Sequence, residues 1–261
     1  MSVIYSVMSL AGLGLLFGIM ITFASKKFEV EQDDRVEKIV EVLPNANCGG
    51  CGFAGCQAYA KAVVDGTAAP DLCSAGGAEA AAKIGEILGI KIDKKEPVAA
   101  CVMCCGSEEN TAPKYQYDGI KNCIAAARVS GGYKGCSFAC LGFGNCVDVC
   151  KFDAISVKNG IADVDKEKCV GCGACVKACP KGLIHMVPKS AKYAVKCSSK
   201  DKGIDTKNNC KGGCIGCGIC EKNCPSDAIK VIDNVAVIDY SKCTSCGACF
   251  KKCPRKIIKK C

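Results

Sequence analysis

Three runs of cysteine share one spacing that is suited to binding metal through thiolates. Each run has three cysteines at three-residue intervals, a fourth after three more residues, and then proline. The runs begin at Cys169, Cys214 and Cys243. Three thiolates from one short loop can surround a [4Fe–4S] cubane, and in this spacing the fourth cysteine binds the other cluster of a pair. The runs therefore predict paired [4Fe–4S] clusters.

The number of cysteines supports metal binding over disulfide bonding. The chain has 27 cysteines in 261 residues, and cysteines this closely spaced cannot all reach disulfide geometry with one another. Zinc ribbons use two CxxC pairs about 15–20 residues apart, which the runs do not match. Thiolates that bind iron must stay reduced, so we expect the clusters to face the cytosol.

The C-terminal half of the sequence contains an internal repeat. Cys150 and Cys224 are 74 residues apart, as are Cys169 and Cys243. The sequence therefore predicts two copies of a βαββαβ-like dicluster module, at 136–187 and 210–261. Asn159-Gly160 and Asp233-Asn234 mark the hairpin turns. Each copy is too small for a large apolar core, so its clusters must supply much of the core.

The crossing of the fourth cysteine assigns the ligands of four clusters. The quartet that starts the first module is irregular, with gaps of three, five and three residues and Lys151 in place of proline. Cys210 aligns with Cys136 in the repeat, so replacement of Cys217 by Cys210 stays open. The predicted sets are Cys136, Cys140, Cys146 and Cys179; Cys150, Cys169, Cys172 and Cys175; Cys214, Cys217, Cys220 and Cys253; and Cys224, Cys243, Cys246 and Cys249.

A fifth site is predicted nearer the N-terminus, in a small helical domain at 27–90. It consists of Cys48, Cys51, Cys56 and Cys73, with glycines between the first three. Zinc is the alternative occupant, because four cysteines that include a CxxC pair also suit zinc. A connector at 91–135 and a basic linker at 188–209 carry most of the remaining cysteines, for which a sixth cluster stays open. These seven are Cys101, Cys104, Cys105, Cys123, Cys197, Cys210 and Cys261.

The first residues predict a membrane anchor. Residues 3–24 carry no charge, and a helix of this length spans about 33 Å, enough to cross a bilayer. Lys26 and Lys27 follow, so the positive-inside rule places the rest of the chain in the cytoplasm. The expected fold is thus α+β: one transmembrane helix at 1–26, the helical four-cysteine domain and two dicluster ferredoxin-like modules, attached to the cell inner membrane by a single pass.

Charge is unevenly distributed. Residues 27–100 hold 8 basic and 12 acidic residues, whereas residues 181–261 hold 17 basic and 6 acidic. A basic C-terminal module suits an acidic protein partner. No aromatic side chains are interleaved with the lysines as a base-stacking platform, so we do not expect nucleic acid. The expected docking residues are Lys251, Lys252, Arg255, Lys256, Lys259 and Lys260.

The order of these parts resembles a known family. The apolar N-terminal segment, the stretch Leu-Pro-Asn-Ala-Asn-Cys-Gly-Gly-Cys-Gly-Phe-Ala-Gly-Cys at 43–56 and the module at 136–180 are similar to RnfB, the iron–sulfur subunit family of Rnf complexes. These complexes are ferredoxin:NAD⁺ oxidoreductases that pump Na⁺ or H⁺; the second module resembles the long forms of anaerobic bacteria. The resemblance implies an electron carrier that accepts electrons from soluble reduced ferredoxin and passes them to membrane and flavin-bearing subunits.

No catalytic residues are predicted for the chain alone. Fully thiolate-bound clusters move single electrons, and the sequence has one histidine and no believable nucleotide fingerprint. Five [4Fe–4S] clusters are the expected cofactors. Two alternatives remain: a membrane-anchored polyferredoxin of a hydrogenase or another oxidoreductase, and a zinc-binding interaction protein without redox function.

Overall fold

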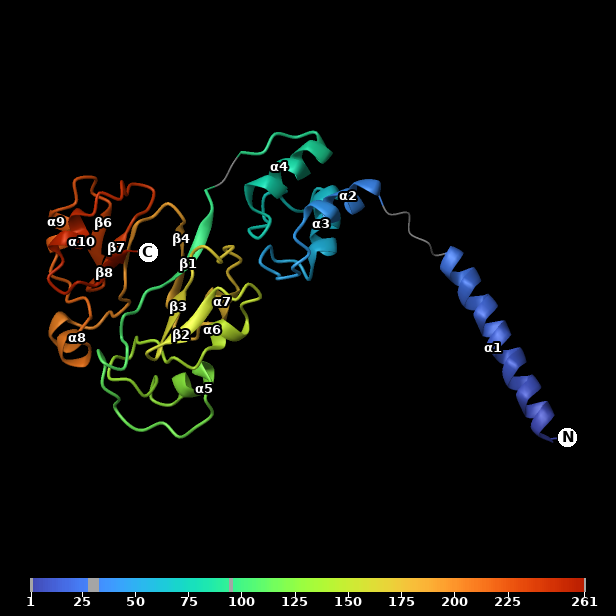
Figure 1. Cartoon of the computed structure of the whole chain (residues 1–261), viewed down its shortest axis with the longest axis horizontal. Helices are drawn as coiled ribbons and strands as arrows, with labels where there is room; N and C mark the ends of the chain where they lie inside the picture. Colours follow the sequence, from blue (N-terminus) through green and yellow to red (C-terminus); the bar gives the residue numbers. More distant parts are fainter. Residues whose placement is uncertain (1, 28–32, 94–95, 261) are drawn as a thin grey trace.

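The computed structural model describes residues 2–27, 33–93 and 96–260. Along the chain, a long helix is followed by a helical unit and then by two small α/β modules (Figure 1). The sheets are all two-stranded and antiparallel in the described ranges. With such small sheets, packing around the cysteines must provide much of the stability of the modules.

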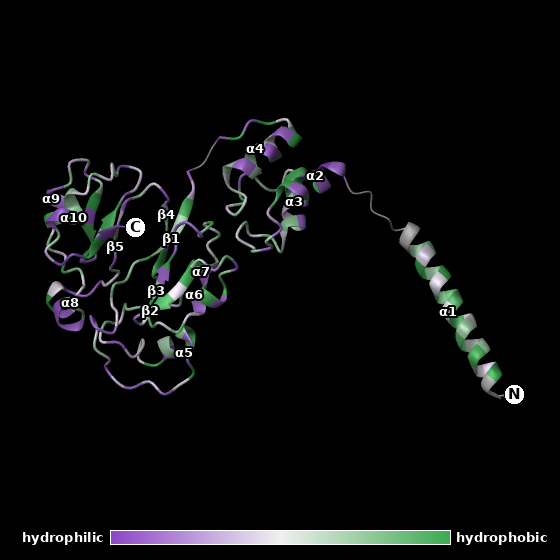
Figure 2. Cartoon of the chain, viewed as in Figure 1, coloured by the Kyte–Doolittle hydropathy of each residue, from purple (hydrophilic) through white to green (hydrophobic). Residues whose placement is uncertain are grey.

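The first helix, α1 (Ser2–Lys27), does not confirm the predicted membrane span. Figure 2 shows apolar residues alternating with paler, less apolar ones along it. Its side chains are described without a break only over residues 10–24, about 23 Å of helix, which is less than the roughly 30 Å of a bilayer core. No helix in the described ranges is long and apolar enough to cross a membrane. The predicted transmembrane helix is therefore wrong.

The helical unit consists of α2 (Asp34–Val42), α3 (Cys56–Val64) and α4 (Gly77–Leu88). Asp33 begins α2, because its side chain accepts a hydrogen bond from the backbone N–H of Arg35 at 2.9 Å. Ile39, Tyr59 and Ile84, one from each helix, are buried together. Since the three helices share one apolar core, α3 and the loop before α4 are held in a fixed relation.

The first module contains two strand pairs and three short helices. Strand β1 pairs antiparallel with β4, with Ala100 opposite Met186, and β2 pairs with β3. Its buried core combines small apolar residues with cysteines. The elements are β1 (Val98–Val102), α5 (Cys123–Arg128), α6 (Asn145–Asp148), β2 (Ile155–Lys158), β3 (Ile161–Val164), α7 (Ala174–Ala178) and β4 (Ile184–Pro188).

The second module repeats this plan. Strand β5 pairs with β8 and β6 pairs with β7. Five elements begin 74 residues after their counterparts in the first module, which agrees with the predicted duplication. The elements are β5 (Tyr193–Val195), α8 (Gly203–Asn209), α9 (Ile219–Lys222), β6 (Ile229–Ile232), β7 (Val235–Ile238), α10 (Ala248–Lys252) and β8 (Ile258–Lys260).

The hairpin turns lie where the sequence places them. Asn159 and Gly160 join β2 to β3 with φ of 48° and 71°. Asp233 and Asn234 join β6 to β7 with φ of 48° and 63°. Two successive left-handed residues are the requirement of a type I′ hairpin, which Asn, Asp and Gly meet at least cost. Both modules are therefore folded by the same local signal.

Candidate iron–sulfur sites

The helical unit brings its four predicted ligands together. The first turn of α3 positions one of them, because the Asn47 side chain accepts a hydrogen bond from the Cys56 N–H at 2.8 Å. Burial raises the pKa of Cys73, and nearby thiolates raise it further. Those thiolates belong to the other predicted ligands, and all four side chains line one pocket: Cys48, Cys51, Cys56 and Cys73.

The run that begins at Cys169 also forms a group. Burial, and then the thiolates of the other predicted members, raise the pKa of Cys175 to about 11. Cys169 accepts a hydrogen bond from the N–H of Ala100 in β1 at 3.3 Å. Strand β1 thus covers this group although it comes from the predicted connector. The members are Cys150, Cys169, Cys172 and Cys175.

The other group of the first module differs from the predicted set in one residue. Burial raises the pKa of Cys146 to about 12, followed by effects of Cys140, Cys123 and Cys179. These four side chains line one pocket. Cys123 begins α5, and its N–H donates to the Asn145 side chain at 2.7 Å. The structure does not bring Cys136 into this group; Cys136 lies in a separate buried cluster with Cys210.

The exchange of Cys123 for Cys136 has a visible cause in the repeat. Phe143 stands 74 residues before Cys217, so the first module lacks the middle thiol of the regular run. The Phe143 ring instead packs against Tyr133 and Tyr117, with ring centroids 5.6 Å away from each. The missing thiol is replaced from outside the run, by Cys123. The repeat itself contains this signal, since the 74-residue offset aligns Cys123 with Cys197.

The second module brings both predicted sets together. Burial raises the pKa of Cys220 to about 11, and the three other members of its set raise it further. Cys217 lines the same pocket as that set, and Cys210 does not line it. Burial and its three partners likewise raise the pKa of Cys249. The two sets are Cys214, Cys217, Cys220 and Cys253, and Cys224, Cys243, Cys246 and Cys249.

The surroundings of these thiols suit thiolate-bound clusters. Backbone N–H groups donate to cysteine sulfur at 3.3–3.4 Å in the helical unit and in both modules, and such bonds stabilise sulfur that carries negative charge. Within the described ranges, no three Cys, His, Asp or Glu side chains close around a single metal ion. A tetrahedral zinc site needs sulfurs only about 3.8 Å apart, from a Zn–S bond of about 2.3 Å. The wider, all-thiol groups fit a cubane better.

The helical unit lies directly against the first module. Lys151 donates to the backbone oxygen of Asn47 at 2.8 Å. A Cβ on Gly50 would lie 2.7 Å from the backbone oxygen of Cys172, so only glycine allows this approach. Burial raises the pKa of Cys172, and the largest thiolate effect on it comes from Cys48. The group at Cys48 and the group at Cys172 are therefore neighbours.

The predicted docking residues fall into three classes. Lys251 and Lys252, in the last turn of α10, and Lys256 are exposed. Arg255 is partly buried and donates to the backbone oxygens of Cys210 and Gly213. Lys259 and Lys260 lie on β8 and line a cavity between the modules. Only the first class is a simple solvated surface.

Family models match the same parts of the chain. Residues 43–75 match a model described as a putative Fe–S cluster, and residues 213–257 match a 4Fe-4S dicluster domain. Residues 162–185 and 140–154 each match a 4Fe-4S binding domain. These matches and the thiol groups confirm the prediction of multiple [4Fe–4S] clusters.

Comparison with curated proteins gives the family. The chain is 47% identical over 230 residues to the B-type subunit of the Na⁺-translocating ferredoxin:NAD⁺ oxidoreductase complex of Acetobacterium woodii, covering 88% of this chain and 69% of the relative. The chain belongs to the RnfB family. It is 43% identical over 240 residues to the B-type subunit of an ion-translocating oxidoreductase complex of Methanosarcina acetivorans, covering 92% and 91%. Membership confirms the predicted RnfB resemblance and the role of the chain as an iron–sulfur electron-transfer subunit.

A third relative has a different coupling ion in its name. The B-type subunit of the proton-translocating ferredoxin:NAD⁺ oxidoreductase complex of Clostridium ljungdahlii is 43% identical over 231 residues, covering 88% of this chain and 81% of the relative. RnfB proteins named for Na⁺ and for H⁺ are thus similarly related to this chain. Sequence similarity in this subunit does not distinguish the coupling ion.

Proposed function

We propose that the chain accepts electrons from soluble reduced ferredoxin and passes them to other subunits of an ion-translocating ferredoxin:NAD⁺ oxidoreductase complex. Bound [4Fe–4S] clusters would supply one-electron transfer at each group of thiols. The chain itself supplies ligands, N–H donors to sulfur and the spacing between groups. Conversion of NAD⁺ is assigned to the other subunits.

The observation that supports this proposal is the sequence of neighbouring thiol groups. The Cys48 group adjoins the Cys172 group, and the cysteines of both groups in the first module share one core. The cysteines of both groups in the second module share another. An electron that enters the second module could therefore leave at the helical unit without crossing a region that lacks thiols, provided that the two modules are connected.

The three exposed lysines of the second module are the proposed ferredoxin contact. Lys251, Lys252 and Lys256 lie near the run that begins at Cys243. Bacterial-type clusters and acidic side chains make ferredoxin an anionic partner, and complementary charge raises the rate of productive encounter. Arg255 is better assigned to structure, since its hydrogen bonds go to backbone oxygens of the same module.

Charge reversal tests the contact. The triple variant Lys251→Glu, Lys252→Glu, Lys256→Glu should raise the KM for reduced ferredoxin roughly five- to tenfold and flatten its dependence on salt, with little change in kcat. The matched control is Lys61→Glu, Lys168→Glu, Lys177→Glu, which makes the same charge change at exposed lysines elsewhere. Equal effects of the two triples would reject the docking surface.

The proposed partners define where the chain works. Ion translocation takes place across a membrane, so contacts with the other subunits would hold this chain at the membrane, with its thiols on the reducing cytoplasmic side. Anaerobic co-purification with flavin-bearing subunits would support this assembly. Co-purification with a hydrogenase subunit in their place would contradict it.

A further inference from the structure

Five cysteines outside the groups described above gather between the two modules. Two of them, Cys136 and Cys210, are buried side by side, and Cys104 packs against them. They come from four separate stretches of the chain. The five are Cys104, Cys105, Cys136, Cys197 and Cys210.

The ionisation of these thiols shows that they face one another. Burial raises the pKa of Cys136, and the thiolates that raise it further are those of Cys104 and Cys210. Burial also raises the pKa of Cys197, followed by effects of Cys214 and Cys136. Five buried thiols with mutual electrostatic effects are costly to keep near one another unless something shared compensates them.

Hydrogen bonds separate one of the five from the others. The Cys104 sulfur accepts from the N–H groups of Gly106 at 3.3 Å and Cys140 at 3.4 Å. The Cys197 sulfur accepts from the N–H of Cys214 at 3.3 Å. These bonds have the same form as those to the ligands of the other groups. Cys105 instead donates its S–H to the backbone oxygen of Gly212 at 2.9 Å, as a neutral thiol does.

Two further groups beside Cys104 suit a charged, sulfur-rich occupant. Among the described residues, the Thr111 hydroxyl is the one buried side-chain oxygen or nitrogen without a hydrogen-bond partner. It lies 3.0 Å from where a Cβ on Gly106 would be, a point that is 3.4 Å from the Cys104 sulfur. Lys134 is 1% exposed, and its ammonium donates to the backbone oxygens of Gly106 and Gly160. A free donor and a buried cation therefore both lie beside this region.

We propose that Cys104, Cys136, Cys197 and Cys210 bind a further [4Fe–4S] cluster between the two modules. Four thiolates complete the ligand set, and the Thr111 hydroxyl is available to donate to sulfur. Lys134 offsets part of the net charge of about −2 that such a cluster carries with its thiolates. Cys105 stays outside the set as a packed thiol.

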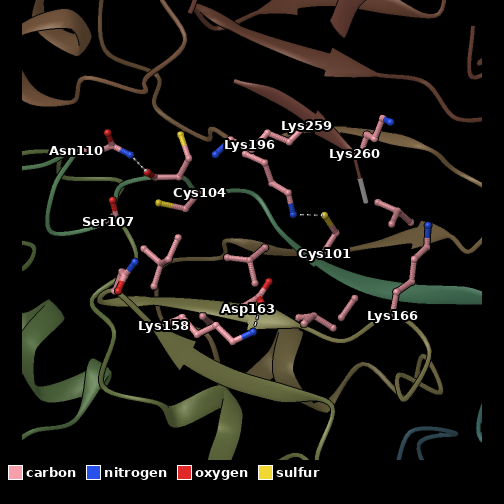
Figure 3. A pocket seen from close by; sticks show the side chains of 18 of the residues that line it. Cys101, Cys104, Ser107, Asn110, Lys158, Asp163, Lys166, Lys196, Lys259 and Lys260 are labelled. Atoms are coloured by element: carbon pink, nitrogen blue, oxygen red, sulfur yellow. Dashed lines mark hydrogen bonds and ion pairs between the residues drawn. The ribbon is translucent and has the colours of Figure 1, made fainter. Parts of the chain in front are cut away.

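The lysine-lined cavity next to this site supports the charge argument. A cavity of about 450 Å³ lies between the modules and is lined by Cys101, Cys104 and five lysines. Figure 3 shows Lys196 reaching Cys101, to whose sulfur its ammonium donates at 3.1 Å. Cys101 is therefore held by Lys196 rather than directed at Cys136 and Cys210. The surrounding positive charge favours an anionic cluster at Cys104.

The proposed site connects the two modules. Cys140, whose N–H binds the Cys104 sulfur, belongs to a group of the first module. Cys214, whose N–H binds the Cys197 sulfur, belongs to a group of the second. Each transfer along this line removes one electron from one group and adds it to the next, with no bond broken and no proton moved. This relay role rests on the proposed function, whereas the cluster site itself does not.

Iron and sulfide counts on the anaerobically purified full chain test the site. Six clusters require about 24 irons per chain and five require about 20, at four irons each. Cys210→Ala and Cys197→Ala should each lower the count by about four. The matched control Cys105→Ala, also a buried thiol, should leave it unchanged. About 20 irons in the wild-type chain, or loss of four irons in Cys105→Ala but not in Cys197→Ala, would overturn the proposal.

A milder variant guards against misfolding. Cys210→Ser keeps a ligand oxygen at the position, so it should alter one electron paramagnetic resonance signal of the reduced protein while the remaining signals persist. An unchanged spectrum would count against Cys210 as a ligand. Reduction by ferredoxin of a wild-type chain with about 20 irons would overturn the sixth site and leave the proposed function intact.

Discussion

At the scale of single residues, a ligand is defined by its environment as much as by its spacing. Cys123 and Cys136 are both near the first ferredoxin-like module in sequence, yet only Cys123 lines the pocket with Cys140, Cys146 and Cys179. The side chain of Asn122 caps α5 by accepting from the N–H groups of the second and third residues of the helix, which fixes where Cys123 stands. A cap directly before Cys123 thus helps to select the ligand.

Replacement of Cys123 separates the two assignments. Cys123→Ala should lower the iron content by about four atoms per chain, because one cluster loses a thiolate. The spacing-based assignment treats Cys123 as spare and expects no loss. The control is Cys101→Ala, which removes a thiol outside all proposed sets and should retain full iron. Inductively coupled plasma measurement of iron and a sulfide assay provide the readout.

At the scale of elements, the helical unit depends on one tyrosine. The Tyr59 hydroxyl donates to the Ala69 carbonyl at 2.9 Å and accepts from the Leu72 N–H at 3.2 Å. These bonds tie α3 to the loop that carries Cys73. Tyr59 is 1% exposed, so both backbone groups would lose a buried partner if the hydroxyl were removed. Tyr59 therefore links helix packing to the geometry of the Cys48 group.

Tyr59→Phe should destabilise the helical unit by about 1–3 kcal/mol, because a buried carbonyl and a buried N–H lose their partner. Iron should also leave the Cys48 group faster under chelator. Burial raises the pKa of Tyr59 to about 12, above the unfolded value near 10. The hydroxyl's contribution is thus complete below about pH 10 and is lost as the pH rises through about 12. Thermal unfolding against pH checks this, with Phe53→Leu as a control that removes ring packing but leaves the hydroxyl.

Local elements were predictable from the sequence, and distant pairings were not. The 74-residue repeat and the Asn-Gly and Asp-Asn turns predict β2, β3, β6 and β7, because hairpins depend on short-range signals. The pairing of β1 with β4 joins distant parts of the chain, such as Val102 and Ile184, and the predicted connector has no periodicity that reveals it. Cys123 was missed for the same reason, since it reaches its group from outside the run. The length of the uncharged N-terminal segment predicted a membrane span that α1 does not provide.

At the scale of the whole molecule, the thiol groups are neighbours from the helical unit to the second module. The helical unit contacts the first module at Gly50 and Lys151, and the proposed site at Cys104 connects that module to the second. Acidic residues prevail over residues 27–100 and basic residues over 181–261. An anionic donor is thereby directed to the end of the chain that lies farthest from the Cys48 group in this order.

The contact between the Cys48 group and the Cys172 group should control transfer between them. Gly50→Ala places a methyl group 2.7 Å from the Cys172 backbone oxygen, so the helical unit must move away from the first module. Lys151→Met removes the hydrogen bond to Asn47 and should act in the same direction more weakly. We expect an unchanged iron count, a normal rate of reduction of the modules by ferredoxin and a slower reduction of the Cys48 group, followed by freeze-quench electron paramagnetic resonance. Lys61→Met, an exposed change on α3, is the control. If Gly50→Ala left the reduction rate of the Cys48 group unchanged, electrons would have to reach that group by a route other than Cys172.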